Sequence, residues 1–142
     1  MRRSPLDEGR RWLEQAEADL RWADDLSQRG GYHIACFLAQ QVGEKALKGF
    51  LYAAGAEVVL GHSIERLCAE AAEQHAAFRE QARRWSILDA HYVPTRYPNS
   101  LPDSIPALVY TGDAAKEAVR LAREIVEYVG DLLNRQPPPG AS

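Results

Sequence analysis

Apolar residues recur at three- and four-residue steps along most of the chain, which is the spacing of an amphipathic helix. Ser4, followed by Asp7 three residues later, is typical of a helix start, and the glycines at 30–31 end that first pattern. No alternating strand pattern exceeds a few residues. The pattern predicts five helices, and it leaves open whether the third and fourth are one bent helix or two. They cover about residues 4–29, 32–54, 64–75, 78–92 and 111–133.

Four prolines interrupt the helical pattern in the segment YVPTRYPNSLPDSIPALVY, residues 92–110. No regular helix is expected there, and long loops in compact domains often carry function. The chain has 142 residues, which favours one domain. The expected fold class is all-α: a four-helix up-and-down bundle with an extra short helix and a proline-rich loop before the last helix. We expect this domain to cover residues 1–136, and residues 137–142 to form a disordered C-terminal tail.

Composition narrows the possible functions. The formal net charge of −3 argues against a polybasic nucleic-acid binder, so any contact with RNA or DNA needs a local patch. Cys36 and Cys68 lack metal-site spacing, which predicts free thiols in a reducing compartment. The chain begins without a signal-peptide pattern and has no apolar run of membrane-spanning length, which predicts a cytoplasmic protein without membrane contact. We expect no metal and no cofactor, because metal-ligand spacing and a glycine-rich phosphate loop are both missing.

The stretch QQVGEKALKG at residues 40–49 combines helical periodicity with five polar side chains. Gln40, Glu44 and Lys48 follow one another at four-residue steps and share one helix face, while Gln41 and Lys45 lie on the neighbouring stripe. Three interpretations fit this spacing. The stripe could be a solvated face with a Glu44–Lys48 pair, a polar seam against a partner subunit or the proline-rich loop, or part of a phosphate site completed by a cation from that loop.

Arg96 in the proline-rich loop is the candidate for that cation. Its planar fork suits a phosphate or a carboxylate, and the competing interpretation is a structural salt bridge to Glu44 or Asp89. Tyr92 and Tyr97 could stack on a nucleic-acid base or could pack the loop onto the bundle. The candidate nucleotide- or phosphate-binding residues are therefore Gln40, Gln41, Glu44, Lys45, Lys48, His62, Tyr92, Arg96 and Tyr97.

Four segments of the chain, in this order and spacing, resemble one protein family over nearly the full length. They are the first helix with Trp12, Ala16, Asp19, Leu20 and Ala23, then YHIACFLAQQVGEKALKGFLYAAG, then GHSIERL with His62, and finally LDAHYVPTRYP. This pattern resembles the HEPN domain (higher eukaryotes and prokaryotes nucleotide-binding). The resemblance implies a four-helix up-and-down bundle that is often dimeric. It also implies a minimal nucleotidyltransferase as partner, because many prokaryotic members are encoded beside one and form a complex with it.

Some such pairs behave as toxin and antitoxin, in which the HEPN protein is a metal-independent RNase, and others are described as nucleotide- or substrate-binding subunits. The RNase members carry an arginine, four to six intervening residues and then a histidine. After Arg96 the expected positions hold residues 101–103, Leu-Pro-Asp, rather than histidine. Arg84 and His91 match the spacing but precede the TRYP segment. Arg96 and His91 are the catalytic candidates, and the departure from the motif argues for binding over cleavage.

Three hypotheses follow from these observations. The first is a HEPN subunit that binds a nucleotide or an RNA-like phosphate ligand and partners a minimal nucleotidyltransferase, in some cases as a toxin–antitoxin pair. The second is a metal-independent endoribonuclease toxin. The third is a helical dimerisation module without a ligand, and all three are compatible with a homodimer or higher homo-oligomer.

Overall fold

Helices make up nearly all regular structure in the computed structural model, which describes residues 3–135. The predicted tail at residues 137–142 lies outside the described residues. No β-strand occurs between residues 3 and 135. The α-helices are α1 (Pro5–Arg29), α2 (Tyr32–Ala53), α3 (Ile64–Ala72), α4 (Phe78–Trp85), α5 (Pro106–Val109) and α6 (Gly112–Asn134), and two 3-10 helices are η1 (Ser86–His91) and η2 (Pro98–Ser100).

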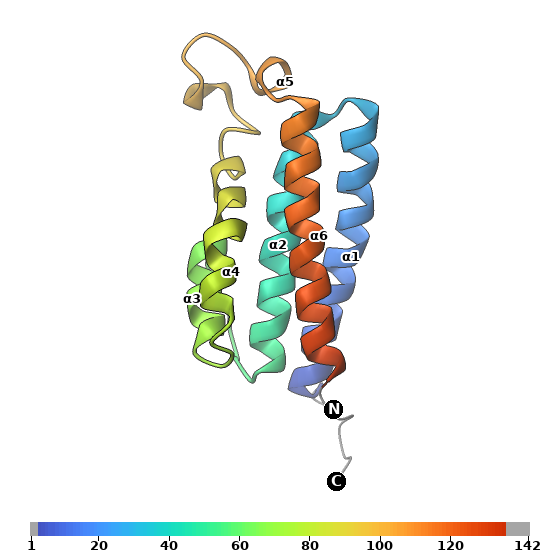
Figure 1. The fold of residues 1–142 in the computed structure, drawn as a ribbon, viewed down its shortest axis with the longest axis vertical. Coiled ribbons are helices and arrows are strands. Elements are labelled where there is room, and N and C mark those ends of the chain that lie inside the picture. Colours follow the sequence, from blue (N-terminus) through green and yellow to red (C-terminus); the bar gives the residue numbers. More distant parts are fainter. Residues whose placement is uncertain (1–2, 136–142) are drawn as a thin grey trace.

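The long helices α1, α2 and α6 lie side by side, and the shorter α3 and α4 form a pair packed against them (Figure 1). Going along the chain, α1, α2, α4 and α6 alternate in direction, and α3 is the extra short helix. The proline-rich loop lies at the end of the bundle where α6 begins, opposite the end where the N-terminus lies (Figure 1). The predicted all-α, up-and-down bundle is therefore confirmed.

The structure differs from the predicted helices in detail. The third and fourth helices are separate, and the fourth is α-helical only to Trp85 before it tightens into η1. This tightening brings Asp89 to the start of α3, where its carboxylate accepts hydrogen bonds from the backbone N–H groups of Ile64 and Glu65 at 2.7 and 3.0 Å. Asp89 thus caps a helix distant in sequence. In the proline-rich segment, η2 and α5 are single turns that begin at prolines, where the missing N–H has no cost.

Two glycines allow α1 and α2 to approach closely. A Cβ atom added to Gly9 would lie 2.5 Å from the Gly49 carbonyl oxygen and 2.6 Å from the Ala53 Cβ. A Cβ atom on Gly49 would lie 2.8 Å from the Gly9 carbonyl oxygen. Because backbone atoms form these contacts, neither side can yield to a larger residue without separating the helices. This close packing positions the polar face of α2 relative to α1.

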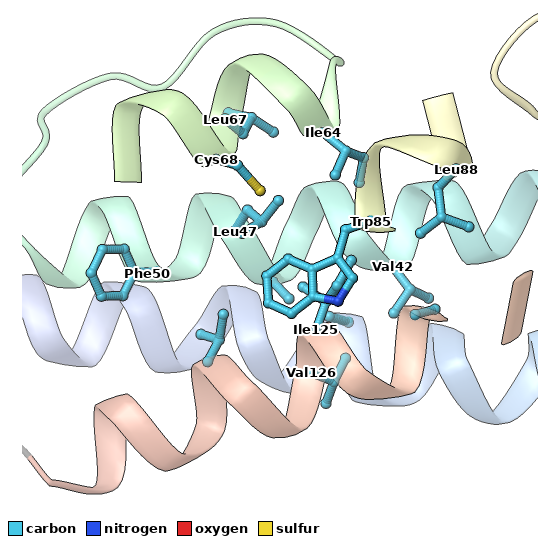
Figure 2. Close-up of a cluster of buried hydrophobic side chains, with 14 of the residues drawn as sticks. Val42, Leu47, Phe50, Ile64, Leu67, Cys68, Trp85, Leu88, Ile125 and Val126 are labelled. Atoms are coloured by element: carbon cyan, nitrogen blue, oxygen red, sulfur yellow. The ribbon is translucent and has the colours of Figure 1, made fainter. Parts of the chain in front are cut away.

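The core lies where α2, α6 and the α3–α4 pair meet (Figure 2). Trp85 is 1% exposed, and Phe78 and Leu47 are fully buried beside it. Cys36 and Cys68 are free thiols inside this core. Burial raises the pKa of Cys36 to about 11, and burial together with the Asp89 carboxylate raises the pKa of Cys68 to about 12.

Candidate functional site

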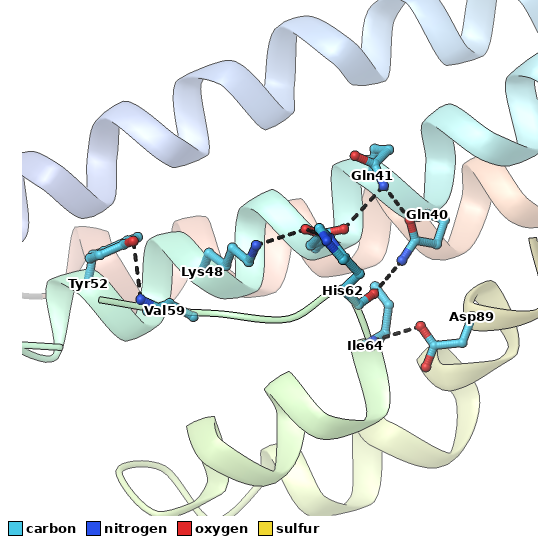
Figure 3. Close-up of polar contacts among 9 residues, drawn as sticks. Gln40, Gln41, Lys48, Tyr52, Val59, His62, Ile64 and Asp89 are labelled. Carbon is cyan, nitrogen blue, oxygen red and sulfur yellow. Dashed lines mark hydrogen bonds and ion pairs between the residues drawn. The ribbon is translucent and has the colours of Figure 1, made fainter. Parts of the chain in front are cut away.

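The polar stripe of α2 faces the loop of residues 54–63, which returns along the helix toward the start of α3 (Figure 3). Near one end of the stripe, the Gln40 side-chain amide donates to the His62 carbonyl oxygen at 2.7 Å. At the other end, the Tyr52 hydroxyl accepts a hydrogen bond from the Val59 backbone N–H at 3.3 Å. The loop is therefore held along its length by side chains that project from α2 at four-residue steps.

Glu44 lies at the centre of this contact and is only 4% exposed. Its carboxylate accepts hydrogen bonds from the Lys48 ammonium at 2.8 Å and from the Gln41 amide at 3.1 Å, and it contacts the His62 Nδ1 atom at 2.8 Å. Gln41 also donates to the Gln40 amide oxygen at 2.7 Å. Burial of a carboxylate requires this number of partners, because the lost hydration must be replaced. The stripe is thus a buried polar network that packs against the chain's own loop, rather than a solvated face.

The two lysines of the stretch have different surroundings, although both are paired with a carboxylate. Lys48 is 7% exposed, bonds Glu44, and lies 5.9 Å from the centre of the Trp12 ring. Lys45 instead points to α1, where it pairs with Asp19 at 2.5 Å. Lys45 borders an open groove of about 690 Å³ along α1, lined also by Glu8, Arg11, Trp12, Glu14, Gln15 and Ala18. The structure therefore does not place Lys45 and Lys48 on a common ligand.

Arg96 lies among three aromatic rings at the edge of the proline-rich loop. Its guanidinium carbon is 4.6 Å from the ring centres of both Phe37 and Tyr92, and 5.1 Å from that of Tyr97. Its Nε atom donates to the Tyr92 carbonyl oxygen at 2.8 Å. Within residues 3–135 no carboxylate forms a salt bridge with Arg96. The terminal nitrogens of an exposed guanidinium are consequently available to an anion.

His62 and Tyr92 connect the buried network to Arg96. The imidazole of His62 stacks on the Tyr92 ring with 5.1 Å between centres and an angle of 20° between planes. The same imidazole contacts Glu44, and the same tyrosine ring contacts Arg96. The His62 side chain is 58% exposed, in contrast to Glu44 below it. The two polar segments singled out in the sequence therefore meet through these two rings.

His91 lies apart from this cluster and packs its ring against Tyr110, with 5.6 Å between ring centres. Burial lowers the pKa of the imidazole, and its Nδ1 atom has no hydrogen-bond partner in the described part of the chain. No hydrogen bond or ring contact joins His91 to the Arg96 side chain in that part of the chain. Arg84, the other half of the sequence match, forms a bidentate pair with Glu124 at 2.7 and 2.8 Å.

Two residues of this site were missed by reasoning from the sequence. Phe37, assigned to the apolar stripe of the second helix, provides one of the rings against Arg96. Asp89, considered only as a partner for Arg96, is occupied by the N-terminus of α3. Sequence spacing contains no signal for either contact, because both depend on how separate segments pack.

The described residues also lack two other kinds of site. Between residues 3 and 135, no three side chains of His, Cys, Asp or Glu gather where they could hold a metal ion. None of the described helices combines the length and the apolar character needed to span a membrane.

The fold and the site define a small all-α bundle with an exposed arginine and aromatic rings at one end. The chain belongs to the HEPN family, because the family model described as HEPN domain matches residues 10–132. The crystal structure of TT1696 from Thermus thermophilus is 42% identical, covers 87% of this chain and 97% of its own, and superposes with a TM-score of 0.77. That of ST0689, an archaeal HEPN homologue, is 35% identical, covers 94% and 99%, and has a TM-score of 0.71. No curated protein matches the chain.

Proposed function

We propose that this HEPN protein binds a nucleotide or a single strand of RNA at Arg96. The observation that supports the proposal is an exposed guanidinium that has aromatic rings around it and no carboxylate partner within residues 3–135. A guanidinium fork matches phosphate geometry, and an exposed tyrosine offers a face on which an unpaired base can stack. Tyr97 is 50% exposed and is the ring best placed for stacking.

The predicted binding residues divide into two groups in this proposal. Arg96, Tyr97, Tyr92 and His62 contact the ligand or border it. The remaining five, Gln40, Gln41, Glu44, Lys45 and Lys48, support the site through their bonds to each other, to the 54–63 loop and to α1. Since both lysines are already neutralised, one phosphate contact through Arg96 dominates the electrostatic part of binding.

Fluorescence anisotropy with a labelled single-stranded RNA tests this assignment. We expect saturable binding that Arg96→Ala weakens about 10- to 100-fold, the value of one charge-assisted hydrogen-bonded contact. Arg79→Ala is the matched control, because Arg79 is an exposed arginine on α4 and should leave binding unchanged. Equal effects of the two substitutions would reject the site.

The salt dependence of the same titration separates one phosphate contact from several. A single contact on a single strand gives a slope of about −0.7 for the logarithm of affinity against the logarithm of salt concentration. A site that also used Lys45 and Lys48 would give a slope roughly three times steeper. Replacing Lys45 with Gln should therefore leave the slope unchanged.

We further propose that a minimal nucleotidyltransferase is the partner, in an arrangement of the toxin–antitoxin kind. The support for this is family membership together with the segments that resemble the nucleotidyltransferase-associated members. Co-expression followed by size-exclusion chromatography tests it. Failure of the two proteins to associate at micromolar concentration and low salt would contradict the partnership without affecting the Arg96 site.

A further inference from the structure

His62 is fixed at two points although most of its side chain is exposed. Its carbonyl oxygen accepts a hydrogen bond from the buried Gln40, and its Nδ1 atom lies 2.8 Å from a Glu44 carboxylate oxygen. Its ring is further restrained by stacking on Tyr92. An exposed imidazole usually retains its rotamer freedom, so three restraints on one residue indicate that its orientation matters.

The contact with Glu44 determines which ring nitrogen faces solvent. A carboxylate paired with Lys48 can only accept, so in the neutral imidazole Nδ1 carries the proton and donates it toward Glu44. Nε2 then keeps its lone pair, and it has no protein partner among residues 3–135. This is the arrangement in which a carboxylate holds a histidine in the tautomer required of a general base.

Arg96 lies on the same aromatic ring as this imidazole. The guanidinium carbon is 4.6 Å and the imidazole centre 5.1 Å from the centre of the Tyr92 ring. The distance between the two groups therefore cannot exceed the sum of these two separations. A group able to accept a proton and a cation able to stabilise a developing charge thus border one exposed surface.

We propose that His62 is the proton-transfer residue of a metal-independent RNA transesterification, with Arg96 as the group that stabilises the phosphorane. This inference rests on the proposed binding of single-stranded RNA at Arg96. RNA supplies its own nucleophile, the ribose 2′-hydroxyl, so neither a metal nor an activated water is needed. The imidazole from the second loop thereby takes the role for which the segment after Arg96 offers no histidine.

The reaction balances without any co-reactant. The His62 Nε2 atom accepts the 2′-hydroxyl proton while the 2′-oxygen forms a bond to the adjacent phosphorus. The bond from phosphorus to the 5′-oxygen of the next nucleotide breaks, and that oxygen takes the proton from the imidazolium. The products are a 2′,3′-cyclic phosphate and a free 5′-hydroxyl. Glu44 is a positioning residue in this scheme, and Lys48 keeps its carboxylate ionised and in place.

Cleavage of a labelled RNA in the presence of EDTA, with analysis of product ends, tests the proposal. We expect wild-type protein to yield 2′,3′-cyclic ends and His62→Gln to lower the rate about 100- to 10,000-fold, the usual value of a general base. Glutamine can still donate to Glu44, so the fold and the loop contact should persist. His33→Gln, purified identically, is the matched control and should cleave at the wild-type rate.

Chemical rescue provides a second readout that a purely structural role would not give. His62→Ala leaves room beside Glu44, and free imidazole should restore cleavage by this variant but not by Arg96→Ala. Equal rates for wild type and His62→Gln, with unchanged melting temperatures, would overturn the assignment of His62. So would a lack of rescue in a His62→Ala variant that still binds RNA.

An RNA with a 2′-deoxy substitution at the scissile nucleotide separates this inference from the binding proposal. It should bind with wild-type affinity and remain uncut. If wild-type protein binds unmodified RNA but leaves it intact, the catalytic role of His62 is rejected and the binding function stands. If neither RNA binds, both proposals fail.

Discussion

Replacement of Glu44 with methionine should destabilise the protein more than any other substitution in the polar stripe. The change leaves the Lys48 ammonium, whose side chain is 9% exposed, without its carboxylate. It also removes the acceptor of the Gln41 amide and of the His62 Nδ1 atom. Breaking a buried ion pair from one side typically costs about 3–5 kcal/mol, because a charge remains buried without compensation. We expect a cost in this range for Glu44→Met.

The reverse substitution, Lys48→Met, should cost less, about 1–3 kcal/mol. Glu44 keeps two of its three partners in that variant, whereas Lys48 has no second carboxylate among the described residues. The double variant should be more stable than Glu44→Met alone, because two apolar side chains of similar length replace the pair. The expected coupling energy is therefore at least about 2 kcal/mol.

Urea unfolding followed by circular dichroism measures these free energies, and about 4 °C of melting temperature corresponds to each kcal/mol for a domain of this size. The exposed pair Asp25–Arg29 has the same four-residue spacing and provides the control. Its substitution with methionine should cost less than about 1 kcal/mol. Equal costs for the buried and exposed pairs, or additive effects of the two substitutions in the stripe, would refute the reasoning.

Three further predictions concern helix packing, capping and the thiols. Gly9→Ala should destabilise by about 1–3 kcal/mol, because its Cβ would meet backbone atoms, whereas Gly130→Ala, whose Cβ would lie 3.8 Å from the nearest side chain, should stabilise by up to about 1 kcal/mol; thermal melts compare them. Asp89→Ala should cost about 1–2 kcal/mol and increase hydrogen exchange at the start of α3, because that helix loses its cap. Cys36 and Cys68, with pKa values raised to about 11 and about 12, should resist a thiol reagent at pH 8 in the native state and react fully in urea. Rapid labelling of folded protein would contradict that burial.

Much of the fold was predictable because helix formation has a local signature. The apolar period, the start at Ser4 and the glycine stop at 30–31 define α1, and the structure places that helix at Pro5–Arg29. The end of the fourth helix was less predictable. There the chain changes to a 3-10 helix at Ser86, and Asp89 in that turn bonds the backbone of α3. Such a contact has no counterpart in local spacing, so the helix was expected to continue to residue 92.

The polar stripe illustrates the same limit for the candidate site. Four-residue spacing correctly placed Gln40, Glu44 and Lys48 on one face, but it does not say what covers that face. The cover is the loop between α2 and α3, which Gly55, at a φ of +107°, helps turn back along α2. Lys45, three residues from Lys48, faces α1 instead and pairs with Asp19. The difference between two similar lysines therefore depends on packing rather than on sequence pattern.

A motif defined by spacing along the chain tests only one way of bringing two groups together. His91 satisfies the spacing from Arg84, yet its ring packs against Tyr110 while Arg84 pairs with Glu124. His62 comes from the loop before α3, at no motif spacing from Arg96, yet both groups contact Tyr92. What the chemistry of a phosphate requires is the position of a base and a cation in space. In this bundle the buried Glu44 and the ring of Tyr92 supply that position, so the His62 and Arg96 substitutions, rather than motif spacing, decide whether the site binds or cleaves.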